Sequence, residues 1–92
     1  IKFVVDVYVP YEEYVDDVIR IIENTSEEFK KENGEYIEEP LEVAGIVELG
    51  VSNVTIRVTG KAKPLSQGKM ENGLRKAIKF SLDENKIRIP NK

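Results

Sequence analysis

The chain opens with alternating apolar and polar positions, a pattern typical of a β-strand. Over residues 2–9, apolar side chains occupy every second position, and Val4 adds an apolar residue on the opposite face. Because successive strand residues point to opposite faces, this pattern predicts a strand that is partly buried on both sides. Pro10 should end the strand, since proline donates no hydrogen bond to a sheet and is favoured in the first turn of a helix.

A helical pattern follows, from Pro10 to the pair Asn33-Gly34, which is a strong stop signal. Glu12 and Glu13 fall in the expected first turn, where carboxylates interact favourably with the positive end of the helix dipole. The apolar residues recur at the spacing of one helix face, at Tyr11, Tyr14, Val15, Val18, Ile22 and Phe29. We therefore predict a helix with one buried face over this segment.

Two further apolar stretches predict a β-hairpin. Residues 41–49 carry apolar side chains on both parities, and Gly45 interrupts them in the manner of a β-bulge. Residues 54–59 alternate regularly between apolar and polar side chains. The short segment between the two stretches, which contains Gly50 and Ser52, is a tight connection, so the strands should pair antiparallel.

The last third of the chain predicts a second helix and a short final strand. Pro64 and Ser66 precede the helix, and Ser66 is a suitable N-cap. The buried stripe of this helix comprises Met70, Leu74, Ala77, Ile78, Ser81 and Leu82. Phe80 lies outside the stripe. Residues 87–90 are typical of a short strand that Pro90 ends.

The order β-α-β-β-α-β predicts an α+β fold of the ferredoxin-like arrangement, with a four-stranded antiparallel sheet and both helices on one face. Ninety-two residues suffice for one small core, so we expect residues 1–92 to form a single domain. The expected interior joins helix residues Val18, Ile22, Leu74 and Ile78 to strand residues Val5, Val7, Ile56 and Val58.

Composition excludes several classes of function. The chain has no Cys and no His, which excludes disulfides, zinc fingers and His-based acid–base catalysis. Lys and Arg number 14 against 17 Asp and Glu, and the net charge of −3 argues against a nucleic-acid partner. No apolar run approaches the roughly 18 residues of a membrane span. Because the first residue is Ile1 and not Met, we expect a fragment of a longer protein.

The remaining candidates for chemistry are weak. Adjacent acidic residues such as Asp16-Asp17 diverge by about 100° around a helix, so they do not converge on one metal ion. Gly68-Lys69 lacks the other residues of a phosphate-binding loop. We therefore expect no enzyme activity, no metal and no cofactor. A basic cluster is best interpreted as a solvated surface, with contact to an acidic partner as the alternative. Its members are Lys61, Lys63, Lys69, Arg75, Lys76 and Lys79.

Aromatic residues offer the best candidates for a binding surface. Tyr8 ends the first strand, and Tyr11 and Tyr14 lie three positions apart on one flank of the expected helix. They either pack this helix onto the sheet edge, which we favour, or contribute to a contact between subunits, where tyrosine is enriched. Phe80, outside its helix stripe, is a weaker candidate for the same contact.

Three segments together resemble a known family. Residues 3–11 form a Val- and Tyr-rich strand that leads into acidic residues, and residues 47–58 contain an ELG-x-S-x-V hairpin with Gly50 and Ser52. Residues 74–90 run from a helix through an acidic turn to Pro90. In order and spacing these segments resemble the C-terminal α/β domain of small-conductance mechanosensitive (MscS-like) channels.

The sequence departs from the family pattern in places. Lys86 replaces a helix-ending glycine, so we expect Asn85 to supply the left-handed turn there. Gly60 and Lys61 replace an apolar residue and a tryptophan at the end of the third strand.

The resemblance implies a structural role. It implies a domain on the cytoplasmic side of the cell membrane, in a homo-heptamer that shapes the vestibule below a tension-gated pore. Contact with the membrane would be made only by helices that precede this segment. The alternative is an ACT-like regulatory domain that binds a small molecule, but Pro10 and Glu12 occupy the place of its glycine-rich turn. RNA binding on the sheet face would require aromatic residues, and residues 54–59 carry none.

Overall fold

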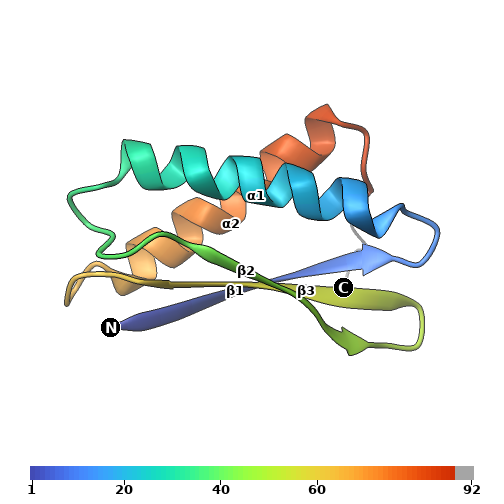
Figure 1. The fold of residues 1–92 in the computed structure, drawn as a ribbon, viewed down its shortest axis with the longest axis horizontal. Coiled ribbons are helices and arrows are strands. Elements are labelled where there is room, and N and C mark those ends of the chain that lie inside the picture. The colour runs from blue at the N-terminus through green and yellow to red at the C-terminus, as the bar shows by residue number, and fades with distance from the viewer. Residues whose placement is uncertain (89–92) are drawn as a thin grey trace.

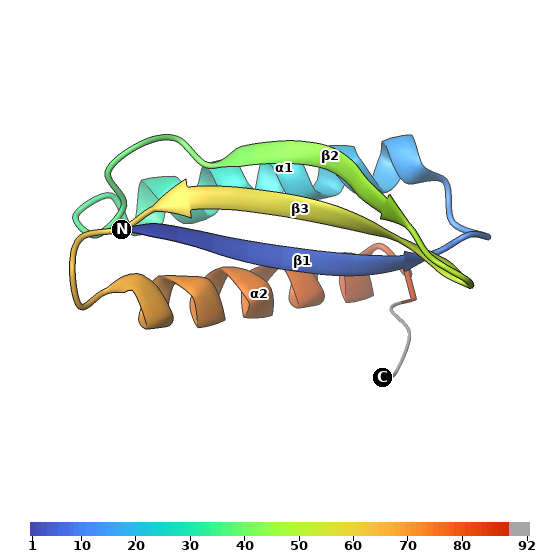
Figure 2. The ribbon, with the colours of Figure 1, turned by 90° about the horizontal axis from the view of Figure 1, so that it is seen from below.

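The computed structural model describes residues 1–88. Its elements are β1 (Lys2–Pro10), α1 (Val15–Glu32), β2 (Glu42–Leu49), β3 (Asn53–Lys61) and α2 (Gln67–Glu84). The strands form an antiparallel sheet in the order β1-β3-β2, and both helices cover one of its faces (Figure 1). Seen from the open side of the sheet, α1 lies behind β2 and α2 lies along β1 (Figure 2). The predicted α+β class and the one-sided placement of the helices are confirmed.

The hydrophobic core lies between the sheet and the two helices. The central strand β3 contributes Val54, Ile56 and Val58, which pair with Val9, Val7 and Val5 of β1. The helices cover this layer with a stripe of buried side chains from each: Val18, Ile22 and Phe29 from α1, and Met70, Leu74, Ile78 and Leu82 from α2. The interior expected from the sequence is therefore confirmed.

The predicted fourth strand, and with it the complete ferredoxin-like sheet, is not confirmed. Over residues 1–88 the sheet has three strands, and neither Ile87 nor Arg88 belongs to one. Ile87 instead packs against the core. Ile89 and Pro90 lie outside the described residues.

The start of α1 differs from the prediction by one turn. Pro10 is still paired with Asn53 in the sheet, and the amide of Glu13 donates to the carbonyl oxygen of Pro10 at 3.1 Å. This turn prevents a helix from starting at Pro10, so α1 begins at Val15. The acidic residues of its first turn are consequently Asp16 and Asp17, and not Glu12 and Glu13.

The predicted bulge in β2 is confirmed. The β2–β3 register shifts between Val43 and Gly45, and again between Ile46 and Glu48. Gly45 has a φ of 90°, a left-handed conformation that glycine adopts without steric cost. Because β2 is an edge strand with two irregularities, several of its apolar side chains are exposed.

The C-terminus of α2 corrects the prediction about its left-handed residue. Asn85 has a φ of −95°, whereas Lys86 has a φ of 60°. The amides of Lys86 and Ile87 donate to the carbonyl oxygens of Asp83 and Leu82, at 3.0 and 2.8 Å. These two bonds form a Schellman motif, in which the left-handed position directly follows the C-cap. Lys86 therefore adopts the conformation that favours glycine.

The Lys86→Gly variant should be more stable than the parent chain by about 1 kcal/mol, because glycine lacks the Cβ that the left-handed conformation strains. Urea denaturation measures this as a higher midpoint with an unchanged slope. Lys86→Ala is the control, because alanine removes the same charge and keeps the strain. An equal gain in both variants would contradict the explanation.

Candidate subunit-contact surface

Three tyrosines gather at one end of the molecule. The turn before α1 and the β2–β3 turn lie together at this end (Figure 2). The Tyr11 hydroxyl donates a hydrogen bond to the carbonyl oxygen of Gly50 and ties the two turns together. Tyr8 is 40% exposed, Tyr11 48% and Tyr14 74%. None of them is buried between helix and sheet, so their rings offer contact area to a partner.

Two apolar residues of the hairpin extend this surface. Leu49 and Val51 are both exposed, and Val51 lies at the tip of the hairpin. Leu49 pairs with Val54 and so points to the helix side of the sheet, whereas Tyr8 pairs with Thr55 in the neighbouring row and points to the open side. The apolar surface therefore wraps around the end of the sheet. We call Tyr8, Tyr11, Tyr14, Leu49 and Val51 the tip patch. The tyrosines of this patch were recognisable from the sequence by their residue type. Leu49 and Val51 were not, because the exposure of a strand end and of a hairpin tip depends on the fold.

Gly50 and Ser52 shape the hairpin that presents the tip patch. The amide of Gly50 donates to the carbonyl oxygen of Asn53 at 2.8 Å. A Cβ on Gly50 would lie 2.9 Å from that same oxygen, so the close approach requires glycine. Ser52 lies exposed in the turn, and its hydroxyl is 3.5 Å from the Asn53 side-chain amide. Pro90, the third motif residue, lies outside the described residues.

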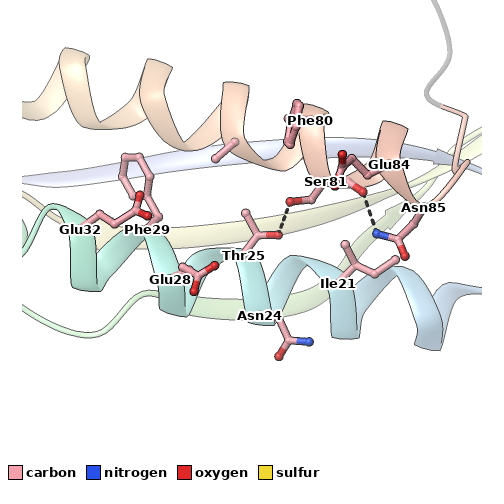
Figure 3. A pocket seen from close by; sticks show the side chains of 11 residues that line it. Ile21, Asn24, Thr25, Glu28, Phe29, Glu32, Phe80, Ser81, Glu84 and Asn85 are labelled. Atoms are coloured by element: carbon pink, nitrogen blue, oxygen red, sulfur yellow. Dashed lines mark hydrogen bonds between the residues drawn. The ribbon is translucent and has the colours of Figure 1, made fainter.

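Phe80 lines a different surface from the tyrosines. It projects from α2 beside a groove of about 640 Å³ between the two helices (Figure 3). Inside this groove the Thr25 hydroxyl donates to the Ser81 hydroxyl oxygen at 2.8 Å, which joins the helices. Three carboxylates also line it, those of Glu28, Glu32 and Glu84. The structure therefore does not bring the four predicted contact residues together: three belong to the tip patch and one to the helix groove.

The open face of the sheet carries an ion pair across β1 and β3. The Arg57 guanidinium donates Nε and one Nη to the two carboxylate oxygens of Asp6, at 2.8 and 3.0 Å. This hydrogen-bonded charge raises the pKa of Arg57 above its usual value. Asp6 and Arg57 alternate with residues of the core, so the pair lies on the sheet face opposite to α1 and α2.

Charge is divided unequally along the chain. Residues 11–50 contain thirteen acidic and three basic residues, whereas residues 61–88 contain eight basic and three acidic residues. The first segment builds α1 and β2 on one flank of the fold, and the second builds α2 on the other flank (Figure 2). Counting charge by segment would have revealed this division in the sequence, where the net charge of −3 conceals it.

Neither α1 nor α2 combines the length and the apolar content that crossing a lipid bilayer requires, within the part of the chain that the structure describes.

Comparison with known proteins agrees with the fold. A sequence model of the family described as "Mechanosensitive ion channel MscS, C-terminal" matches residues 3–89. A small-conductance mechanosensitive channel of Caldanaerobacter subterraneus subsp. tengcongensis is 32% identical over 87 residues, which is 95% of this chain and 30% of that protein. The crystal structure of Helicobacter pylori MscS in its closed state superposes on the whole chain with a TM-score of 0.75, at 23% identity and over 35% of its own length. The chain thus spans about a third of the length of both relatives. By its sequence match over nearly all of its length, the chain belongs to the family of MscS C-terminal domains.

Proposed function

We propose that this chain is the assembly domain of a membrane-tension-gated channel, where it holds the subunits of a homo-oligomer together below the pore. The observation that carries the proposal is the family match over residues 3–89. The relatives are named as mechanosensitive channels, and both are about three times longer than this chain. The pore would therefore be formed by a part of the full-length protein outside residues 1–92. Residues 1–92 would form one domain of that protein, on the cytoplasmic side of the membrane. The intact channel would contain seven copies of this domain.

The geometry fits a structural role without catalysis. The tip patch gives the domain an exposed aromatic and aliphatic surface, and such residues are enriched where subunits meet. The closed core beneath it holds the two turns in fixed positions. Nothing favours the ACT-like alternative, because the turn after β1 runs through Pro10, Tyr11 and Glu12 and contains no glycine that could bring backbone amides to a ligand.

The test uses the full-length protein that contains this chain. Expressed in a bacterial strain without mechanosensitive channels, it should raise survival of hypo-osmotic shock and give conductance that opens with suction on a membrane patch. A tip-patch variant, Tyr14→Ala with Val51→Ser, should lower the fraction of assembled oligomer in detergent while the domain keeps its melting temperature. Leu65→Ala is the control, because Leu65 is a fully exposed apolar residue outside the patch. A full-length protein without tension-gated conductance would contradict the proposed function.

A further inference from the structure

A second cleft, of about 440 Å³, lies on the outer flank of the domain, between α1 and the start of β2. Its apolar part is formed by Pro40, Leu41 and Val43. The rim of the cleft carries the carboxylates of Glu23, Glu27 and Glu42 and the ammonium group of Lys30. We call this the flank cleft. Its chemistry is an aliphatic floor with a negatively charged rim.

A buried hydroxyl in the flank cleft lacks a partner. Ser26 lines the cleft and is only 2% exposed. Its Oγ makes no hydrogen bond to the described residues. Leaving a buried hydroxyl unpaired costs free energy, so such an atom in a cleft marks a position where a ligand can supply the missing bond.

The side chains that fit this combination are lysine and arginine. Their aliphatic stems pack on apolar floors while the charged heads reach polar groups. A cation in the flank cleft would meet Glu23, Glu27 and Glu42, and it would donate to the Ser26 hydroxyl oxygen. The occupant is therefore a basic side chain presented by a surface of complementary charge.

The same chain carries such a surface on its opposite flank. Gly73 and Ala77 of α2 face α1, since a Cβ on Gly73 would lie 3.0 Å from the Phe29 ring and Ala77 lines the helix groove. Arg75 and Lys79 follow them by two positions, about 200° around the helix, and so face away from α1. Both side chains are more than half exposed.

The ion pairs that Arg75 and Lys79 already make do not prevent this use. Arg75 lies 3.9 Å from Glu71, and Lys79 lies 2.6 Å from Asp83, each one turn along the same helix. Exposed pairs of this kind contribute little to stability, so they exchange readily for a partner.

We propose that the flank cleft of one copy of this chain receives Arg75 and Lys79 of the next copy. The inference rests on the proposed homo-oligomer and adds which surfaces meet. Because the two surfaces differ and lie on opposite flanks, the contact is heterologous. Its repetition gives a ring where the rotation between copies closes, and not a two-fold dimer. A second copy is favoured over a free cation because the acidic and basic excesses lie on the two opposite flanks of one domain.

Charge exchange in the full-length protein tests the proposal. Glu23→Lys with Glu27→Lys should weaken assembly about tenfold or more at low salt, as should Arg75→Glu with Lys79→Glu. Combining all four substitutions should restore assembly, because the charges then match again. The control is Glu35→Lys with Glu38→Lys, the same change of charge in an exposed loop outside the flank cleft. Failure of the combined variant to recover above either pair would overturn the proposal.

Ser26→Ala separates binding from folding. Removing the unpaired hydroxyl should leave the melting temperature of the domain unchanged or higher, whereas assembly should weaken. A variant that assembles as well as the parent would overturn the role given to Ser26 and, with it, the cleft as the contact.

Disulfide trapping distinguishes the type of contact, because residues 1–92 contain no cysteine. In a full-length background without cysteines, Glu27→Cys with Arg75→Cys should cross-link into a ladder of oligomers under mild oxidation. Cross-linking by Glu27→Cys alone would show a two-fold contact and overturn the proposal.

An oligomer in which the double variant does not cross-link would overturn only this inference, whereas a monomeric full-length protein would overturn the proposed function as well. Binding of a lysine-rich peptide that Glu27→Lys abolishes, with assembly unchanged, would assign the cleft to a separate basic partner.

Discussion

Replacing Leu74 with alanine will lower the free energy of unfolding of the chain by about 2–5 kcal/mol. Leu74 is fully buried in the middle of α2, where it belongs to the core shared by the sheet and both helices. The substitution removes three buried carbon atoms and leaves a cavity that close-packed neighbours fill only in part. In a domain of this size such a loss is a large fraction of the total stability.

The measurement is urea denaturation followed by circular dichroism, with Leu65→Ala as the matched control. Leu65 is the same residue type and is 101% exposed, so its truncation should change the free energy by less than about 0.5 kcal/mol. Equal midpoints for the two variants would mean that Leu74 does not lie in the interior. The arrangement of both helices on one sheet face would then be wrong.

The sequence predicted the features that depend on periodicity. The buried stripe of α2 follows from the four-residue spacing of Met70, Leu74, Ile78 and Leu82, and the strands follow from their alternation. Both patterns report which face of an element is apolar, and this face is the one that the core covers. The core residues could therefore be derived before their partners were known.

Element ends were harder to predict, because they depend on contacts that a local pattern does not contain. Pro10 is a good first residue of a helix, but its pairing with Asn53 across the sheet extends β1 instead. Asn85 tolerates a left-handed conformation better than Lys86, yet the hydrogen bonds of the Schellman motif fix that conformation one position later. In both places the hydrogen bonds that the fold imposes on the backbone outweigh the intrinsic conformational preference of the residue.

The two candidate contact surfaces also differ in how far the sequence predicts them. The tyrosines of the tip patch were recognisable because their residue type is enriched at interfaces. The flank cleft was not, because it needs Ser26 and Glu27 of α1 beside Leu41 and Val43, which only the tertiary structure brings together. Acidic residues in α1 look like a solvated surface until the basic flank on the opposite side is known.

Gly60→Ala will be destabilising by about 1–3 kcal/mol, because no space exists for its Cβ. Gly60 pairs with Phe3 in the sheet, and a Cβ placed there would lie 2.7 Å from Cζ of the Phe3 ring and would also collide with the Leu41 side chain. The end of the Leu41 side chain can rotate away, whereas the Phe3 ring is buried and fixed in the core. The phenyl ring thus occupies the space above Gly60, which explains why a larger apolar residue is absent from this position.

A double-mutant cycle attributes this cost to the ring. In a Phe3→Leu background, Gly60→Ala should cost less than in the parent chain by about 1 kcal/mol, since the smaller side chain leaves space for the methyl group. Gly68→Ala is the matched control, because no atom lies within 4 Å of its Cβ position and Gly68 belongs to the first turn of α2. That variant should gain up to about 1 kcal/mol, since alanine favours the helix. The free energies of unfolding of the four cycle members and the control are measured by thermal or urea unfolding. If Gly60→Ala costs as much in the Phe3→Leu background as in the parent chain, Leu41 and not Phe3 requires glycine at the end of β3.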